Sequence, residues 1–121
     1  MVPKSILLVQ YNQSGREALA AILRRYKYHI SSATQGMQAL ALLEENTTNI
    51  NCLIVVDHFS DMPGQELIAM ARARFPLVKT VMISSQPDDE EEKFVKANGC
   101  DVYLPDYSDK NILLSTVERL L

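Results

Sequence analysis

One carboxylate in this chain stands where chemistry would be expected. An unbroken apolar run, CLIVV over residues 52–56, leads directly into Asp57. Short runs rich in Val and Ile are typical of strands that are buried on both faces, as in a parallel sheet. Ligands of open α/β sheets bind outside the carboxyl ends of the strands, so Asp57 is the first candidate for a functional residue. His58 follows it in a turn-rich loop and is expected to face solvent.

The rest of the chain alternates apolar runs with amphipathic stretches. The runs predict strands at residues 5–9, 28–33, 52–56, 79–83 and 102–104. Between and after them, apolar residues recur at helical spacing, which predicts five helices. Right-handed crossovers place helices on both faces of such a sheet. The predicted fold class is therefore α/β, a three-layer αβα sandwich around a parallel sheet.

Local signals indicate where some of these helices begin and which side chains they bury. Ser14, with Glu17 three residues on, predicts a capping box at the first helix. Ser108 is expected to cap the last helix, and the acidic run at residues 88–92 suits the positive end of the fourth helix dipole. The last helix is predicted to face these residues inward: Ile112, Leu113, Thr116, Val117 and Leu120.

Length and composition indicate one ordinary globular domain over residues 1–121. Apolar residues make up 47% of the chain and charged residues 22%, unlike disordered or fibrous sequences. A net charge of −3 argues against direct nucleic-acid binding, and no apolar run approaches the roughly 20 residues of a membrane span. Cys52 and Cys100 stand alone in strand-like contexts and are expected to be buried thiols, so the predicted location is cytoplasmic.

Six motifs in chain order resemble the receiver domain of two-component response regulators. They are ILLV at 6–9, AxxGxxAL at 33–40, LIVVD at 53–57, GxEL at 64–67, VMIS at 81–84 and GCDxYL at 99–104. The resemblance covers nearly the whole chain. It implies a flavodoxin-like (βα)5 fold with parallel strand order 2-1-3-4-5, and a signalling domain that is not an enzyme. The residues expected in the core are Ile6, Leu8, Leu53, Val55, Val81 and Ile83.

The resemblance also implies which residues would take part in phosphorylation. Asp57 would be the phosphoacceptor, and Ser84 and Tyr103 would respond to the phosphoryl group. In that family, an acidic pair after the first strand, the acceptor Asp and a backbone carbonyl two residues later hold Mg²⁺. Here the metal ligands would be Asp57 and the carbonyl of Phe59. A Lys after the fifth strand contacts the phosphoryl oxygens in that family.

Two parts of this site depart from the family pattern. Gln10 and Tyr11 occupy the acidic-pair positions, and Pro105 or Asp106 stands where the family has Lys. Mg²⁺ is usually bound through one or two carboxylates, and phosphoryl transfer depends on cations that offset the developing charge. We therefore expect weak magnesium binding and slow phosphorylation of Asp57.

The main hypothesis is a receiver with a degenerate phosphorylation site that acts through protein contacts. In it, Asp57 is a strand-end carboxylate bonded to nearby backbone amides, and Gln10 donates its amide to Asp57 in place of a cation. The first alternative is a conventional receiver phosphorylated on Asp57 by a histidine kinase. A flavodoxin-like nucleotide-binding protein is a remote alternative, because QYNQSG at residues 10–15 only weakly resembles a phosphate-binding loop.

The expected contact surface is the face formed by the fourth helix, the fifth strand and the fifth helix. It would present Lys93, Lys96, Tyr103 and Tyr107 to a histidine kinase, to another signalling protein or to a second copy of the chain. Tyrosine suits such a surface because it buries a large area while keeping a polar tip. The resemblance also allows for an effector domain on a longer chain.

Overall fold

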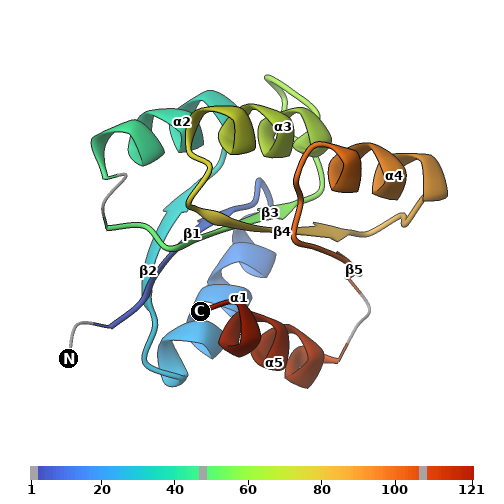
Figure 1. The fold of residues 1–121 in the computed structure, drawn as a ribbon. Helices are drawn as coiled ribbons and strands as arrows, with labels where there is room; N and C mark the ends of the chain where they lie inside the picture. Colours follow the sequence, from blue (N-terminus) through green and yellow to red (C-terminus); the bar gives the residue numbers. More distant parts are fainter. Residues whose placement is uncertain (1–2, 47–48, 107–108) are drawn as a thin grey trace.

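The computed structural model describes residues 3–46, 49–106 and 109–121. Within them, five parallel strands form one sheet in the order β2-β1-β3-β4-β5 (Figure 1). The strands are β1 (Ser5–Val9), β2 (His29–Ala33), β3 (Cys52–Val56), β4 (Lys79–Ser84) and β5 (Val102–Pro105). The predicted α/β class and strand order are both confirmed.

Helices cover both faces of the sheet, as the connections between parallel strands require. One face carries α1 (Gln13–Arg25) and α5 (Lys110–Leu120) (Figure 1). The other carries α2 (Gly36–Glu45), α3 (Gly64–Arg74) and α4 (Asp89–Ala97). None of the helices in the described ranges has the length and apolar character needed to cross a membrane. The result is the three-layer αβα sandwich that the pattern predicts.

The sheet buries a separate apolar cluster on each face. Successive residues of a strand point to opposite faces, so the all-apolar strand β3 contributes to both clusters. Leu53 and Val55 pack toward α2 and α3, whereas Ile54 packs toward α1 and α5. All six residues expected in the core are buried: Ile6, Leu8, Leu53, Val55, Val81 and Ile83.

The first helix begins earlier than the capping-box signal predicts. Asn12, rather than Ser14, is the N-cap, and its Oδ1 accepts from the backbone N–H of Gly15 at 2.7 Å. Asn is as good an N-cap as Ser, and it takes this role because its backbone is extended at the end of the preceding loop. The helix therefore starts at Gln13, close to the end of β1.

The last helix is also capped by a different residue from the one expected. Asp109 accepts from the N–H of Asn111 at 2.7 Å, while Ser108 lies outside the described residues. Ile112 is 47% exposed, so the expectation that it faces inward is wrong. Leu113 and Val117 occupy the sheet-facing positions of α5 and leave Ile112 beside them on the solvent side.

The fourth helix is anchored to the sheet by little apolar surface. Val95 is its only buried side chain within the described residues, and Phe94 is 46% exposed. The acidic first turn is present as predicted, and Asp88 caps the helix by accepting from the N–H of Glu91 at 3.0 Å. Polar contacts must therefore contribute to the attachment of α4.

Candidate functional site

Asp57 leaves the sheet directly at the carboxyl end of β3. Its backbone N–H donates to the carbonyl of Ile83 at 2.9 Å, which extends the β3–β4 pairing by one residue. Its φ is 58°, in the left-handed region that Asp tolerates better than most residues. The backbone thus turns out of the sheet at Asp57 itself. This left-handed main-chain conformation determines the direction in which the carboxylate points.

The start of α3 packs tightly against this turn. A Cβ at Gly64 would collide with the carbonyl oxygen of Asp57, so glycine is required there for this close approach. The N–H of Gly64 donates to Nδ1 of His58 at 2.9 Å, which satisfies one of the free donors at the helix start. His58 faces solvent as expected, and it also accepts a hydrogen bond at the start of α3.

The carboxylate of Asp57 is held by the backbone rather than by Gln10. Its Oδ1 accepts from the N–H of Ser85 at 2.6 Å, the kind of bond that a strand-end carboxylate was expected to make. No hydrogen bond joins Gln10 to Asp57, so that expectation is wrong. The side chain of Gln10 instead fills the space over Gly15, where a Cβ would overlap its Nε2, and its Oε1 is buried without a partner in the described part of the chain.

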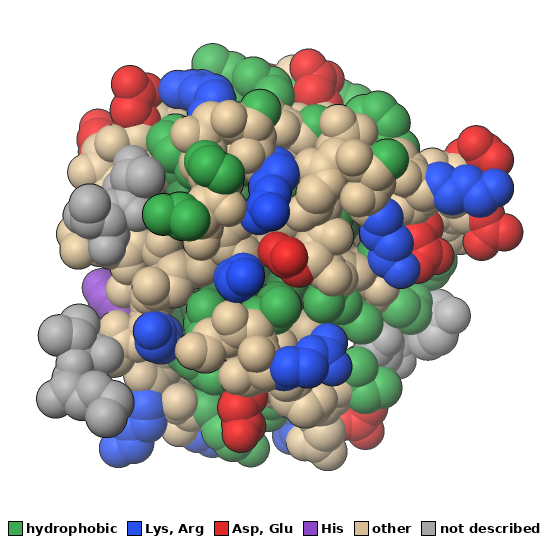
Figure 2. Space-filling model, in the orientation of Figure 1, with side chains coloured by type: hydrophobic (Ala, Val, Ile, Leu, Met, Phe, Trp, Pro, Cys, Tyr) green, Lys and Arg blue, Asp and Glu red, His purple; other side chains and the backbone are tan. Residues whose placement is uncertain are grey.

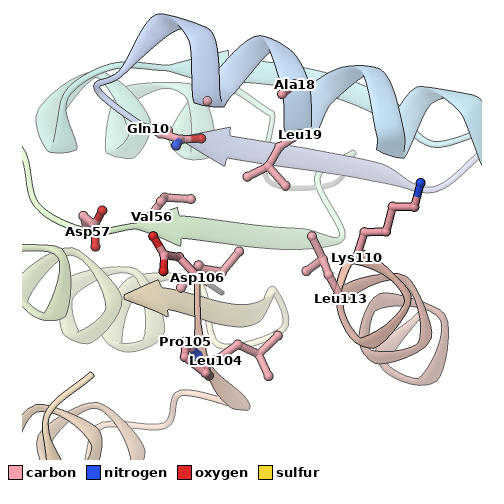
Figure 3. A pocket seen from close by; sticks show the side chains of 12 residues that line it. Gln10, Ala18, Leu19, Val56, Asp57, Leu104, Pro105, Asp106, Lys110 and Leu113 are labelled. Atoms are coloured by element: carbon pink, nitrogen blue, oxygen red, sulfur yellow. The ribbon is translucent and has the colours of Figure 1, made fainter. Parts of the chain in front are cut away.

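The sheet brings the other predicted site residues to the same edge. Gln10 and Tyr11 follow β1, and Asp106 follows β5, where its N–H donates to the carbonyl of Ser84 at 2.8 Å. Ser84 is only 2% exposed, and its Oγ accepts from the N–H of Gln86 at 3.3 Å. Pro105, the last residue of β5, and Asp106 line one cavity together with Gln10 and Asp57 (Figure 3).

This set of donors is a poor match to a magnesium site. Tyr11 is 65% exposed and Gln10 is turned onto Gly15, so neither acidic-pair position offers a carboxylate. Among the residues described, no three His, Cys, Asp or Glu side chains gather as possible metal ligands. Mg²⁺ requires near-octahedral oxygen ligation, usually with one or two carboxylates, and Asp57 alone supplies that chemistry at the predicted positions.

A chain of polar contacts links the loop after Asp57 to α4 and β5. Nε2 of His58 lies 3.4 Å from Oε2 of Glu91, and Oε1 of Glu91 accepts from the hydroxyl of Tyr103 at 2.6 Å. The same hydroxyl accepts from the N–H of Asp88 at 3.2 Å. Burial and the hydrogen bond to Glu91 raise the pKa of Tyr103. Sequence reasoning missed Glu91, because nothing local distinguishes it from the acids around it.

The surface expected to contact partners is only partly as predicted. Lys93 and Lys96 are exposed on α4, where acidic and basic side chains stand side by side (Figure 2). Lys96 Nζ lies 2.7 Å from Oε2 of Glu92. Tyr103 is only 9% exposed, so the expectation that it presents itself to a partner is wrong in this conformation. Tyr107 lies outside the described residues.

Comparison with known proteins shows which family this chain resembles in sequence. A family model described as "Response regulator receiver domain" matches residues 6–118. A relative named "Two-component response regulator ARR10", from Arabidopsis thaliana, is 30% identical over 100 residues, which cover 82% of this chain and 18% of that protein. The chain spans less than a fifth of the length of the curated relatives it matches.

Solved structures share the fold. A response regulator receiver domain protein (CheY-like) from Methanospirillum hungatei JF-1 has a TM-score of 0.92 and 25% identity, with 98% of this chain and 94% of that one covered. A response regulator protein from Burkholderia pseudomallei, with a phosphorylated aspartic acid and a calcium ion, has a TM-score of 0.82 and 21% identity. There the match covers 96% of this chain and 71% of that one.

Proposed function

This chain belongs to the response regulator receiver domain family of two-component systems, and we propose that it is a receiver whose phosphorylation site is degenerate. The observation that carries this proposal is the composition of the strand ends around Asp57. They supply an amide, a phenol and a further carboxylate, at Gln10, Tyr11 and Asp106, in place of an acidic pair and a cation. The domain then acts through protein contacts rather than through efficient phosphoryl transfer.

The electrostatics of the site support slow phosphorylation. A phosphoryl group carries negative charge, and its transfer depends on positive charge placed where more charge develops. Asp57 receives one neutral N–H, from Ser85, while Asp106 adds a second negative charge to the same cavity. Removal of a single oxyanion donor typically slows a reaction by about 10²–10³-fold. Loss of both the cation and most of the metal ligands should slow it much further.

The proposed output is binding through the α4–β5–α5 face. Each of the two helices exposes a large apolar side chain, Phe94 on α4 and Ile112 on α5, and α4 also exposes Lys93 and Lys96. The partner is a histidine kinase, another signalling protein or a second copy of the chain. We place this domain in the cytoplasm and assign it no enzymatic activity of its own.

A conventional receiver is the second candidate, and one observation favours it. Asp57 and Ser84 line a common cavity, so the acceptor and the hydroxyl that would respond to it are both in reach of a phosphoryl group. In that case the kinase acts on Asp57, and Mg²⁺ binds through Asp57 and the carbonyl of Phe59 despite the missing acidic pair.

Intact-mass measurement after incubation with Mg²⁺ and acetyl phosphate separates the two candidates. We expect the mass to stay unchanged over minutes, with a conventional receiver phosphorylated in parallel as the positive control. A rapid gain of one phosphoryl group that is lost in Asp57→Asn would overturn the degenerate site. Asp57→Asn is well suited as a control because it keeps the side-chain shape and can still accept from Ser85.

A further inference from the structure

A cavity of about 310 Å³ lies between α1, α5 and the carboxyl ends of β3 and β5 (Figure 3). Its walls are largely apolar, with Leu19 from α1, Leu104 from β5 and Leu113 from α5. Sites for small organic ligands begin at about this size. At about 30 Å³ per water-sized group, the cavity has room for roughly ten such groups.

Several polar groups that line this cavity are hydrogen-bond acceptors that lack a donor among the described residues. Oδ1 of Asp57 accepts from the backbone, but its second oxygen and the carboxylate of Asp106 have no hydrogen bond or ion pair within the described ranges. Oε1 of Gln10, in the same lining, is buried without a partner there. Lys110 also lines the cavity, but Figure 3 shows its ammonium well apart from Asp57 and Asp106. No cationic side chain of the described residues therefore pairs with the carboxylates at this end of the cavity.

We propose that this cavity binds an amphiphilic organic cation, a protonated primary amine with a short apolar body. The ammonium group lies at the end lined by Asp57 and Asp106 and donates to their carboxylates. The apolar body packs between Leu19 and Leu113 and loses its contact with water. This inference goes beyond the proposed function and rests on its degenerate site, because a conventional receiver would bind Mg²⁺ at Asp57 instead.

Other classes of ligand fit the cavity less well. A metal ion such as Mg²⁺ keeps several waters and needs oxygen ligands on all sides, whereas leucine side chains form much of this wall. An anion would be repelled by the two carboxylates, and a neutral molecule would leave their charge uncompensated. A net charge of −3 further favours a cationic ligand.

Phenethylamine is a suitable probe, with phenethyl alcohol as the neutral molecule of matched shape. Each is titrated into the isotope-labelled chain and followed by amide NMR signals. We expect saturable shifts that centre on Gly15, Leu19, Leu104 and Asp106, and an affinity for the amine about tenfold higher than for the alcohol, a difference typical of a charge-assisted hydrogen bond. Equal affinities, shifts spread over the whole surface, or displacement of the amine by equimolar MgCl₂ would each overturn the proposal.

Two variants and one control test the place of binding. Asp106→Asn removes one carboxylate at an exposed position, so it should fold normally and lose about tenfold in amine affinity, while alcohol binding stays unchanged. Ala18→Phe, at an exposed position of α1 that lines the cavity, should block both probes. Asp89→Asn on α4 makes the same change in net charge away from the cavity and should leave amine affinity unchanged. If Asp106→Asn and Asp89→Asn weaken binding equally, the amine responds to overall charge and the site is refuted.

Discussion

Replacement of Tyr103 by phenylalanine should weaken the attachment of α4 to β5. The hydroxyl of Tyr103 donates to Glu91 at 2.6 Å and accepts from the N–H of Asp88 at 3.2 Å. The ring is only 9% exposed and stays in place in Tyr103→Phe, so the substitution removes the contacts of this hydroxyl, including one with Ser84, and little else. It leaves the side chain of Glu91, which is 11% exposed, without its donor from β5.

The magnitude follows from the kinds of hydrogen bond that are lost. A hydrogen bond to a charged group contributes about 1.5–3 kcal/mol and a neutral one about 0.5–1.5 kcal/mol. His58 at 3.4 Å and some solvent remain available to Glu91, which offsets part of the loss. We expect the free energy of unfolding to fall by about 2 kcal/mol. For a domain of this size, that lowers the Tm by roughly 6–10 °C.

Urea denaturation followed by circular dichroism measures this change, provided that the m-value is the same in both proteins. Tyr26→Phe is the matched control, because Tyr26 is 55% exposed and should tolerate loss of its hydroxyl within about 0.5 kcal/mol. A double-mutant cycle with Glu91→Gln should give a coupling energy of about 1 kcal/mol for Tyr103→Phe and none for Tyr26→Phe. If the two tyrosine variants behave alike, the hydrogen bonds of Tyr103 do not hold α4 and the reasoning is refuted.

Three further predictions concern the site, the surface and the core. Gln10→Asp combined with Tyr11→Asp should create Mg²⁺ binding at some loss of stability, because three carboxylates then crowd together. A Tm that rises with Mg²⁺ only in this variant would show it, and an equal rise in the unmodified chain would contradict it. Charge reversal of Lys93 and Lys96 to Glu should weaken self-association or partner capture, and unchanged sedimentation and pull-down would exclude that face. Burial raises the pKa of Cys52 from 9.0 to about 12, so this thiol favours the folded state below pH 9.0 and loses that contribution as pH rises toward 12. A thiol reagent at mildly alkaline pH should therefore label Cys52 only on unfolding, and labelling as fast as in urea would contradict this.

The sequence by itself determined the architecture and the place of the site. A strand that is buried on both faces consists of apolar residues only, as residues 52–56 do. A helix that packs on a sheet has apolar residues at helical spacing, so each element can be recognised from its own residues. The position of Asp57 at a strand end and the neutral residues Gln10 and Tyr11 are likewise visible in the chain. The role of Asp57 as a phosphoacceptor stays a prediction.

Tertiary structure alone determined which side chains meet. Asp106 and Gln10 come from opposite ends of the chain and share a cavity only because β1 and β5 end at the same edge of the sheet. Glu91 meets Tyr103 because α4 packs against β5, where the hydroxyl of the buried tyrosine reaches its carboxylate. Patterns along a chain report the burial of each residue, which repeats with the period of its own element. The partners of a polar side chain depend on how distant elements are placed relative to one another. The apolar periodicity within one element carries no information about that placement.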